Sequence, residues 1–359
     1  MMQTDSSAPD PYEISGEVIA AGTRQNIAIP VSQSVSGLSA NLALQVIHGK
    51  QRGPCIFVSG AIHGDEIIGT AVIQRLTALL HPETLSGTVI LAPAVNIYGF
   101  VQHSRYLPDR RDLNRSFPGN PGGSLASQLA YCFLENVIDR CSLGIDIHTA
   151  AIHRYNLPQI RVASGSPYLI ELAMAFGAPI IIESPLRPGS MRALAADRET
   201  PMLLLEAGEA LRFDRHSIAI GAAGVLRVLA HIGMIAADDG LSHIGIPLRA
   251  NRSLWVRAPR GGVSRRRHRS GDIVHRGDVL AQVGGLFGED LMDVLSPLDG
   301  IIIGHTTLPV VNQGDALFHV AEVANFENAG KQAGSIIEAI SVSAPPFPAE
   351  PLLDEDEVH

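Results

Sequence analysis

The stretch Cys55-Ile56-Phe57-Val58-Ser59-Gly60-Ala61-Ile62-His63-Gly64-Asp65-Glu66 leads from a short apolar run into a polar loop, and a helical pattern over residues 67–80 follows it. An apolar run of this length predicts a buried strand. Similar runs alternate with longer helical patterns as far as about residue 236. This alternation predicts an α/β fold with a mixed, mostly parallel sheet flanked by helices.

The same alternation predicts the other elements of this region and one long loop. Strands are expected at residues 88–91, 143–147, 180–182 and 202–205, and helices at residues 124–140, 167–176 and 215–230. Residues 99–123 combine glycines, prolines and four arginines in a loop. Loops of this length inside compact domains usually serve a function.

Sequence typical of β-structure flanks the α/β region on both sides. On the C-terminal side, residues 258–262 (Ala-Pro-Arg-Gly-Gly) are weakly repeated at residues 296–300 (Ser-Pro-Leu-Asp-Gly), which predicts a small pseudo-symmetric β-domain. We therefore divide the chain into an N-terminal lead and β segment (1–45), the α/β domain (46–240), the β-domain (245–323) and an acidic, proline-rich tail that we expect to be disordered (324–359).

Composition argues against several classes of function. The net charge of −9 disfavours nucleic acid as a partner. No uninterrupted apolar run reaches the roughly 18 residues that a membrane span needs. Residues 1–12 have none of the features of a secretory signal, so we expect a cytoplasmic protein. The cysteines Cys55, Cys132 and Cys141 form neither a disulfide framework nor a paired metal-binding motif. The sequence leaves a homo-oligomer open.

Three of the predicted strands run into polar residues that can bind or activate a ligand. His63 and Glu66 follow the first strand, and His148 and Glu206 end two later ones. Ligand sites of open α/β sheets form at the carboxyl ends of the strands. Two histidines and one carboxylate are an established ligand set for catalytic zinc. We therefore predict that one zinc ion per chain binds His63, Glu66 and His148, in preference to a helix-capping role for the first two.

A fourth polar position and the long loop supply candidates for catalysis and substrate binding. Glu206 follows three leucines, so we expect its carboxyl to be partly shielded from water. A carboxylate beside a metal-activated water is a candidate general base. Glu209 is the alternative candidate for the general base, but it lies beyond the turn that follows the predicted strand. In the loop, Asn114 and Arg115 suit a substrate carboxylate close to the metal.

Four motifs occur together in one order. They are His63-Gly64-Asp65-Glu66, Asp112-Leu113-Asn114-Arg115, Asp146-Ile147-His148-Thr149 and Leu205-Glu206. In order and spacing they resemble the succinylglutamate desuccinylase/aspartoacylase family, which has a zinc carboxypeptidase-like fold. The resemblance extends over roughly residues 50–322.

The resemblance assigns roles to these residues. It implies zinc on the two histidines and the glutamate named above, with Glu206 as general base and later general acid. It implies that Asn114 and Arg115 bind the substrate carboxylate. It also implies an arginine that polarises the scissile carbonyl. Arg105 matches this position best, and Arg111 is the alternative and a further candidate for substrate binding.

The activity implied by the resemblance is that of a zinc-dependent amidohydrolase that cleaves the amide bond of small N-acyl amino acids, with the acyl group and the amino acid left open. The alternatives are a metallocarboxypeptidase acting on short peptides and a non-catalytic binding protein of the same fold. The carboxypeptidase branch more often has arginine at the position of Asp65, so the sequence favours the deacylase. The β-domain resembles biotinyl/lipoyl hybrid barrels, which implies a smaller all-β, barrel-sandwich-like C-terminal domain. Its hairpin at residues 284–295 lacks the carrier lysine.

Overall fold

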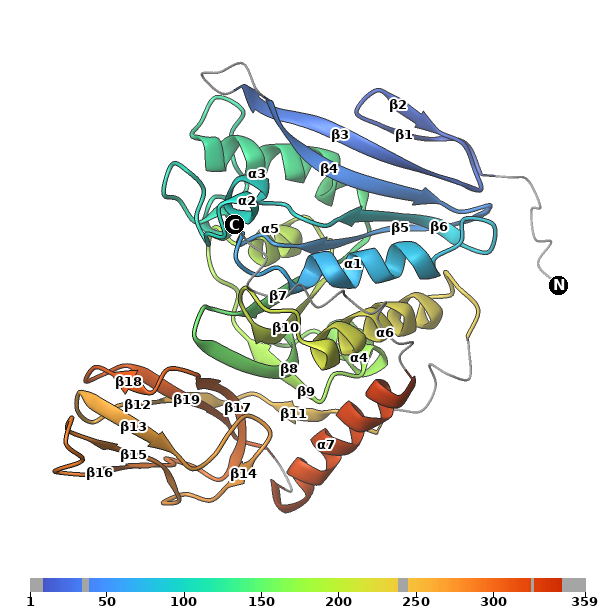
Figure 1. Ribbon diagram of the computed structural model, residues 1–359. Coiled ribbons are helices and arrows are strands. Elements are labelled where there is room, and N and C mark those ends of the chain that lie inside the picture. Colours follow the sequence, from blue (N-terminus) through green and yellow to red (C-terminus); the bar gives the residue numbers. More distant parts are fainter. Residues whose placement is uncertain (1–8, 34–38, 238–244, 324–325, 344–359) are drawn as a thin grey trace, which may run out of the picture.

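A 13-stranded mixed sheet runs through the molecule (Figure 1). The structure is a computed structural model that describes residues 9–33, 39–237, 245–323 and 326–343. Along the sheet the main order is β12 (Ser253–Arg257), β19 (Ala316–Ala321), β17 (Gly300–Thr306), β8 (Arg154–Ala163), β10 (Met202–Glu209), β7 (Leu143–Ala150), β5 (Gln51–Gly60), β6 (Ser86–Ala92), β4 (Ser39–His48) and β3 (Thr23–Gln33). The strands β9 (Ile180–Ser184), β11 (Leu248–Ala250) and β14 (Ile273–Val274) pair beside this path.

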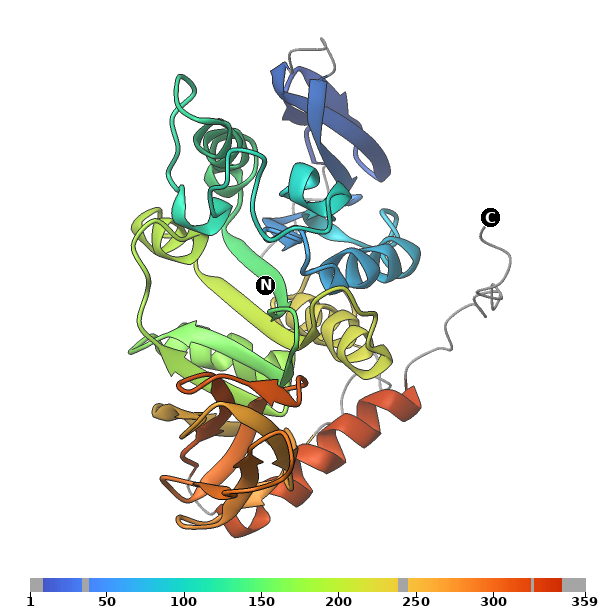
Figure 2. The same cartoon turned by 60° about the vertical axis from the view of Figure 1, so that its left-hand side comes forward.

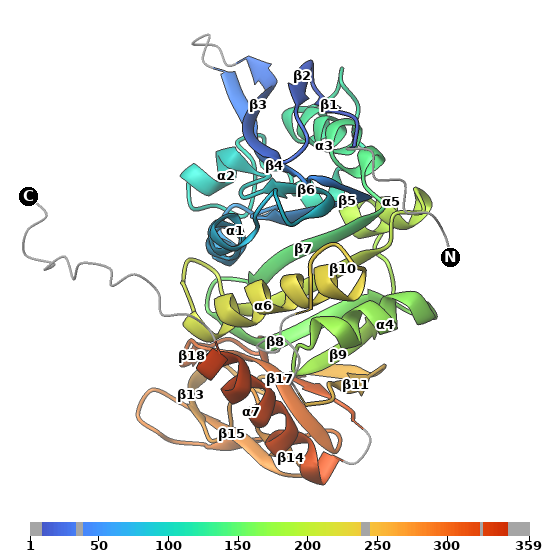
Figure 3. The same cartoon turned by 90° about the vertical axis from the view of Figure 1, so that its right-hand side faces the viewer.

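Four parallel neighbours, β6, β5, β7 and β10, form the centre of the sheet. All eight residues of β7 are buried, as expected for a strand that is covered on both faces. One face is covered by α1 (Ile68–Leu79), α4 (Pro167–Phe176) and α6 (Arg215–His231), and Figure 3 shows these helices across the front of the sheet. The other face packs against α3 (Leu125–Asn136) and α5 (Met191–Asp197), so there is an apolar core on each side.

The predicted mixed α/β fold is confirmed, and each predicted strand of the α/β region lies within β5, β6, β7, β9 or β10. The elements that were not predicted include the strand β8 and the helix α5. β8 carries Arg154, Asn156, Gln159 and Arg161 between its apolar residues, so it lacks the apolar run that marks its neighbours. α5 has seven residues, too few to show a clear helical period.

The β-domain consists of two packed layers. A four-stranded sheet of β16 (Met292–Leu295), β15 (Val279–Gly284), β13 (Gly262–Arg266) and β18 (Val310–Val311) shares a core with β12, β17 and β19. β17 pairs with β8, so this domain is joined to the α/β layer through one continuous sheet. Figure 2 shows it in orange and red against the green strands.

The N-terminal boundary differs from the prediction. β4 pairs with β6, so the proposed division at residue 46 falls inside a strand of the central sheet. A separate hairpin of β1 (Tyr12–Ile14) and β2 (Glu17–Ile19) precedes this sheet. The N-terminal β segment is therefore part of the α/β layer and not a region apart.

The predicted disordered tail is wrong over residues 326–343, which form α7 (Phe326–Ser343). Ala329, Ala333 and Ile336 are buried, and their spacing makes one apolar face that packs on α6 and β17. The acidic, proline-rich composition begins only after this helix, and residues 344–359 lie outside the described part of the chain. None of the described helices combines the length and apolar character that crossing a membrane requires.

Candidate active site

The loop after β5 brings His63 and Glu66 to the carboxyl end of the sheet. It lies so close to α2 (Ile97–Val101) that a Cβ on Gly64 would meet the carbonyl carbon of Gly99 at 2.0 Å. The missing side chain at Gly64 therefore allows the backbone approach that shapes this loop.

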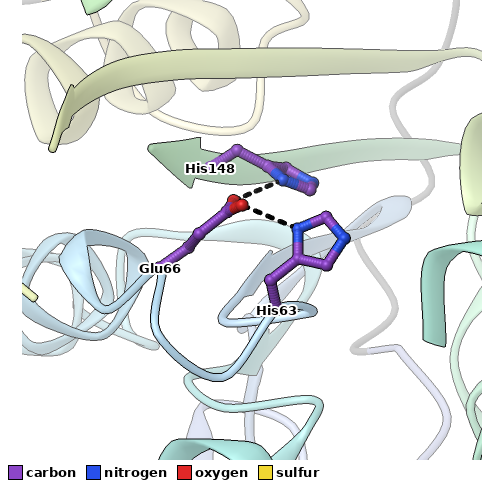
Figure 4. A group of neighbouring side chains, drawn as sticks. All are labelled: His63, Glu66 and His148. Carbon is purple, nitrogen blue, oxygen red and sulfur yellow. Dashed lines mark hydrogen bonds and ion pairs between the residues drawn. The ribbon is translucent and has the colours of Figure 1, made fainter. Parts of the chain in front are cut away.

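His63, Glu66 and His148 form a buried cluster, although they come from two distant parts of the chain (Figure 4). One oxygen of Glu66 lies 2.8 Å from Nδ1 of His63, and the other lies 2.7 Å from Nδ1 of His148. One possible ligand atom from each residue lies within 4.8 Å of the other two. The three residues predicted to bind zinc are therefore within reach of a single ion.

A carboxylate holds the other nitrogen of each imidazole. Oδ1 of Asp112 lies 3.1 Å from Nε2 of His63, and Oδ2 of Asp146 lies 2.7 Å from Nε2 of His148. The hydroxyl of Ser59 donates to the second oxygen of Asp146 at 2.7 Å. Metal-binding histidines almost always have such a partner, which fixes the ring and its tautomer. Both rings are thereby held with Nδ1 towards the centre of the cluster.

Opposite charges dominate the electrostatics of this cluster. Burial disfavours the imidazolium of His148, but Asp146 and Glu66 outweigh burial and raise its pKa well above the ordinary value. Burial disfavours the carboxylate of Glu66, but His63 and His148 outweigh it and hold its pKa well below the ordinary value. The cluster therefore favours positive charge. Protons can supply this charge, or a divalent cation can replace the protons.

Nδ1 of His63 indicates that the cluster fits such a cation. This atom is buried and makes no hydrogen bond within the described part of the chain, although Glu66 is close by. A buried nitrogen without a partner is costly, and a metal ion provides the partner. Two imidazole nitrogens and one carboxylate match the ligands of catalytic zinc sites. The residues present therefore fit zinc.

Glu206 lies on the strand next to His148. In the parallel pair β10 and β7, these two residues are Cα partners. Oε2 of Glu206 accepts a hydrogen bond from Nδ2 of Asn156 at 2.9 Å, and Oε1 lies 3.9 Å from Nη1 of Arg161. The side chain is 17% exposed, in agreement with the expectation that it is partly shielded. A proton acceptor therefore lies beside the candidate metal ligands.

A cavity of about 210 Å³ opens at the cluster, and Glu206 also lines it. Among the described residues, its lining includes six arginines but only two carboxylates, those of Glu66 and Glu206. The arginines are Arg105, Arg115, Arg154, Arg161, Arg187 and Arg192. An excess of one charge in a cleft attracts ligands of the opposite charge, so this cavity suits an anionic ligand.

Two of these guanidinium groups are poorly compensated. Nε of Arg161 and Nη1 of Arg192 are buried and have no hydrogen-bond partner within the described chain. Burial, followed by the neighbouring charge of Arg161, lowers the pKa of Arg192 to about 10, and Arg187 adds to the lowering while Glu206 opposes it. Like charges gathered in a partly buried wall are costly unless an anion joins them.

Of the two arginines considered for polarising the carbonyl, Arg105 reaches the cavity and Arg111 does not. The guanidinium of Arg105 donates to Glu66 at 3.0 Å and to Asp112 at 3.2 Å. Arg111 is exposed and is not among the described residues that line the cavity. It follows a tight turn, in which the N–H of Arg110 donates to the carbonyl of Leu107 at 2.8 Å. Arg111 was the alternative for polarising the carbonyl and a candidate for substrate binding, but the structure does not bring it to the site.

Asn114 and Arg115 line the cavity as expected. They lie in the short helix η1 (Leu113–Arg115), which Asp112 caps by accepting a hydrogen bond from the N–H of Asn114 at 2.9 Å. The side-chain oxygen of Asn114 accepts from the N–H of Met191 at 2.9 Å, which orients its amide. The amide nitrogen and the guanidinium are donors, as a carboxylate ligand requires.

Sequence reasoning missed one wall of the cavity. This wall contains Arg154, Asn156 and Arg161 from β8, Arg187 and Arg192 from the segment around α5, and Trp255 from the β-domain. The sequence analysis also assigned no role to Asp146, the carboxylate that holds Nε2 of His148. The signal for Asp146 was available, because residues two apart on a strand share a face, and Asp146 precedes His148 by two.

The model of the succinylglutamate desuccinylase/aspartoacylase catalytic domain matches residues 52–232. The chain belongs to this family. The resemblance carried by the four motifs is thereby confirmed, and membership supports hydrolysis of N-acyl amino acids as the activity.

Similar proteins match along most of their length. The N-α-acetyl-L-2,4-diaminobutyric acid deacetylase of Halomonas elongata is 26% identical over an alignment of 337 residues, and the match covers 89% of this chain and 98% of that protein. The crystal structure of a succinylglutamate desuccinylase/aspartoacylase from Rhodobacter sphaeroides is 29% identical, has a TM-score of 0.74, and covers 84% of this chain and 96% of that one. The ectoine utilization protein EutE of Ruegeria pomeroyi shares the fold with a TM-score of 0.75 at 24% identity, and the match covers 83% of this chain and 95% of that one.

Proposed function

We propose that this chain is a zinc-dependent hydrolase that cleaves the amide bond of small N-acyl amino acids, with Glu206 as the general base. The observation that carries the proposal is that a buried His–Glu–His cluster, a carboxylate on the adjacent strand and several arginines line one cavity. His63, Glu66 and His148 would hold the zinc. When bound, zinc supplies a Lewis acid that polarises the amide carbonyl and activates water.

Glu206 moves the proton in this proposal. Asn156 holds one of its oxygens at 2.9 Å, which fixes the carboxylate at the cavity wall. Glu206 takes a proton from the attacking water and then delivers it to the nitrogen of the leaving amine. A single carboxylate can perform both transfers because it receives in the first the proton that it donates in the second.

The arginines and Asn114 orient the substrate and stabilise the developing charge. Arg105 is tied to Glu66 and Asp112, so its guanidinium lies beside the metal-ligand cluster, where it stabilises the negative charge on the carbonyl oxygen. Asn114 and Arg115 bind the carboxylate of the amino acid through their N–H donors.

The charge of the cavity favours a substrate with a second acidic group. The deacetylase of Halomonas elongata is named for a substrate with a side-chain amine. Here the carboxylates in the described lining are Glu66 and Glu206, and both already have a role. Arg161 and Arg192 instead offer buried donors without a partner. An N-acyl derivative of an acidic amino acid, or a dicarboxylic acyl group on an amino acid, matches these donors.

A substrate panel tests both parts of the proposal. Zinc-loaded protein is incubated with N-acetyl-L-aspartate, N-succinyl-L-glutamate, N-α-acetyl-L-2,4-diaminobutyrate and short peptides, and the released amine is measured. We expect release from the acidic compounds, its loss after chelation and its return with zinc. No release from any acylated amino acid contradicts the hydrolase. Release chiefly from the diaminobutyrate derivative contradicts only the proposal that the substrate has a second acidic group, and it leaves the hydrolase proposal in place.

A further inference from the structure

A pair of thiols lies at the opposite end of the strands that carry the metal-ligand cluster. Cys55 lies at the middle of β5 and Cys141 lies two residues before the start of β7, and their Sγ atoms are 3.5 Å apart. The hydroxyl of Tyr12 lies 3.5 Å from Sγ of Cys55. We propose that Cys55 and Cys141 are an oxidative modification site, at which a hydroperoxide produces an intramolecular disulfide.

The backbone keeps the two thiols together. β5 and β7 are parallel neighbours in the sheet. The N–H of Ser142 donates to the carbonyl of Cys55 at 2.8 Å, and the hydroxyl of Thr200 donates to the carbonyl of Cys141 at 3.2 Å. The sulfurs of a disulfide are about 2.05 Å apart, so they must approach by roughly 1.5 Å. Rotation about the side-chain bonds can supply a movement of this size without a change in strand pairing.

The surroundings give the two thiols different roles. Hydrogen bonds to the Cys141 thiol, and less strongly to the Tyr12 hydroxyl, lower the pKa of Cys55 although burial opposes them, and Arg140 adds to the lowering. Burial raises the pKa of Cys141 well above the ordinary value. The thiolate is the nucleophile in thiol oxidation. Cys55 is also only partly buried, whereas Cys141 is buried, so Cys55 is the attacking thiol and Cys141 the resolving one.

The reaction has two steps. The sulfur of Cys55 attacks one oxygen of hydrogen peroxide, the O–O bond breaks, and hydroxide leaves and takes up a proton to become water, so that Cys55 becomes a sulfenic acid. The sulfur of Cys141 then attacks the sulfur of Cys55, the S–O bond breaks, and the leaving hydroxyl takes the Cys141 proton to form a second water. Two thiols are oxidised by two electrons in total, and one peroxide is reduced to two waters.

The third cysteine provides a matched control. Cys132 lies on α3, where burial raises its pKa to about 11. Its Sγ lies 3.9 Å from Nδ2 of Asn136. The chain contains no cysteines besides Cys132 and the proposed pair. Cys132→Ser therefore leaves a protein in which every thiol belongs to the pair.

The experiment treats the full-length wild type and Cys132→Ser with stoichiometric hydrogen peroxide, followed by thiol titration and non-reducing peptide mapping. We expect Cys132→Ser to lose both thiols and about 2 Da, to give one cross-linked peptide containing residues 55 and 141, and to regain the thiols with dithiothreitol. We expect Tm to rise by about 5 °C, since the bridge closes a long loop. In Cys132→Ser/Cys141→Ser, Cys55 should stop at a sulfenic acid that dimedone traps.

Two results would overturn the inference. One is that both thiols survive a peroxide excess that oxidises the methionines. The other is that Cys55 proceeds to sulfinic acid while Cys141 stays reduced in the same molecule. Peptide mapping of the wild type gives the answer even where a variant folds poorly. The readouts are thiol content and Tm, so the outcome does not depend on the proposed hydrolase activity.

Discussion

Glu206 and His148 are Cα partners on the adjacent parallel strands β10 and β7. Neighbouring strands lie about 4.8 Å apart, so the candidate base and a candidate metal ligand leave the sheet side by side. Their separation is set by the hydrogen-bonded register of two buried strands and not by a loop. Functional groups on such rigid elements are held more accurately than groups on loops.

Glu206→Gln tests the role of this pair. The substitution removes the proton acceptor, keeps the size of the side chain and leaves the metal-ligand cluster untouched. We expect kcat to fall by about 10²- to 10⁴-fold, the usual contribution of general acid–base catalysis. Zinc content, measured by elemental analysis of the dialysed protein, should stay at the wild-type value.

Glu209→Gln is the control for that variant, because Glu209 lies on the same strand beyond a bulge and accepts from the N–H of His153 at 3.1 Å. Its kcat should stay within about twofold of wild type, as for most substitutions away from the chemistry. Equal losses of kcat in both variants, or near-normal kcat in Glu206→Gln, would contradict the assignment of Glu206 as the general base.

Asp146→Asn tests whether the carboxylate behind His148 supports metal binding. Asp146 fixes Nε2 of His148 at 2.7 Å and is itself held by Ser59. Loss of such a carboxylate typically weakens metal binding by about 10- to 100-fold. Competition with a chromogenic chelator measures the zinc Kd directly. Asp139→Asn, at an exposed ion pair with Arg198, should leave Kd unchanged. An unchanged Kd in Asp146→Asn would show that the carboxylate does not support the ligand.

The metal-ligand cluster could be predicted from the sequence because its residues directly follow apolar strands. The hydrophobic pattern gives the strand and its end, and parallel strands bring their carboxyl ends to one edge. His148 and Glu206 follow this rule, and both lie at that edge. His63 and Glu66 lie in the loop that follows β5, at the same edge.

The arginine wall could not be predicted in the same way. Arg154 and Arg161 belong to β8, three of whose polar residues line the cavity, so the strand has no apolar signature. Trp255 reaches the cavity because β17 pairs with β8, a contact between residues about 150 positions apart that no local pattern encodes. Arg111 shows the converse, since its residue type suited the site but its side chain is exposed and is not part of the described cavity lining.

Arg192→Gln tests the binding of a second acidic group, and it depends on the proposed activity. A hydrogen bond to a charged group contributes about 1.5–3 kcal/mol. We therefore expect KM to rise by about 10- to 100-fold for substrates with two carboxylates and to change little for those with one. Steady-state kinetics on matched substrate pairs measure this difference. Arg249→Gln, whose exposed guanidinium pairs with Glu183 at 2.9 Å, should have no such effect. Equal changes for both substrate types would contradict the assignment.

We expect His319 to make the fold sensitive to acid. Its ring stacks on Trp255 with centroids 4.4 Å apart and planes at 12°, and its Nδ1 is buried without a hydrogen-bond partner among the described residues. Burial, with Arg161 adding to it, lowers the pKa of His319 to about 3. A histidine in the unfolded chain titrates near about 6.5. Between these values the unfolded chain binds a proton that the folded chain does not, so the free energy of unfolding falls as pH falls.

His319→Gln removes this contribution. Between about pH 6.5 and pH 4.5, the free energy of unfolding should fall less steeply than in the wild type, by up to about 1.4 kcal/mol per pH unit. Denaturant titrations followed by the fluorescence of Trp255, the only tryptophan in the chain, measure the slope. Phe287→Ala, at a side chain that is 98% exposed and does not titrate, should keep the wild-type slope. If His319→Gln also keeps it, the imidazole is not held neutral against Trp255 in the folded protein.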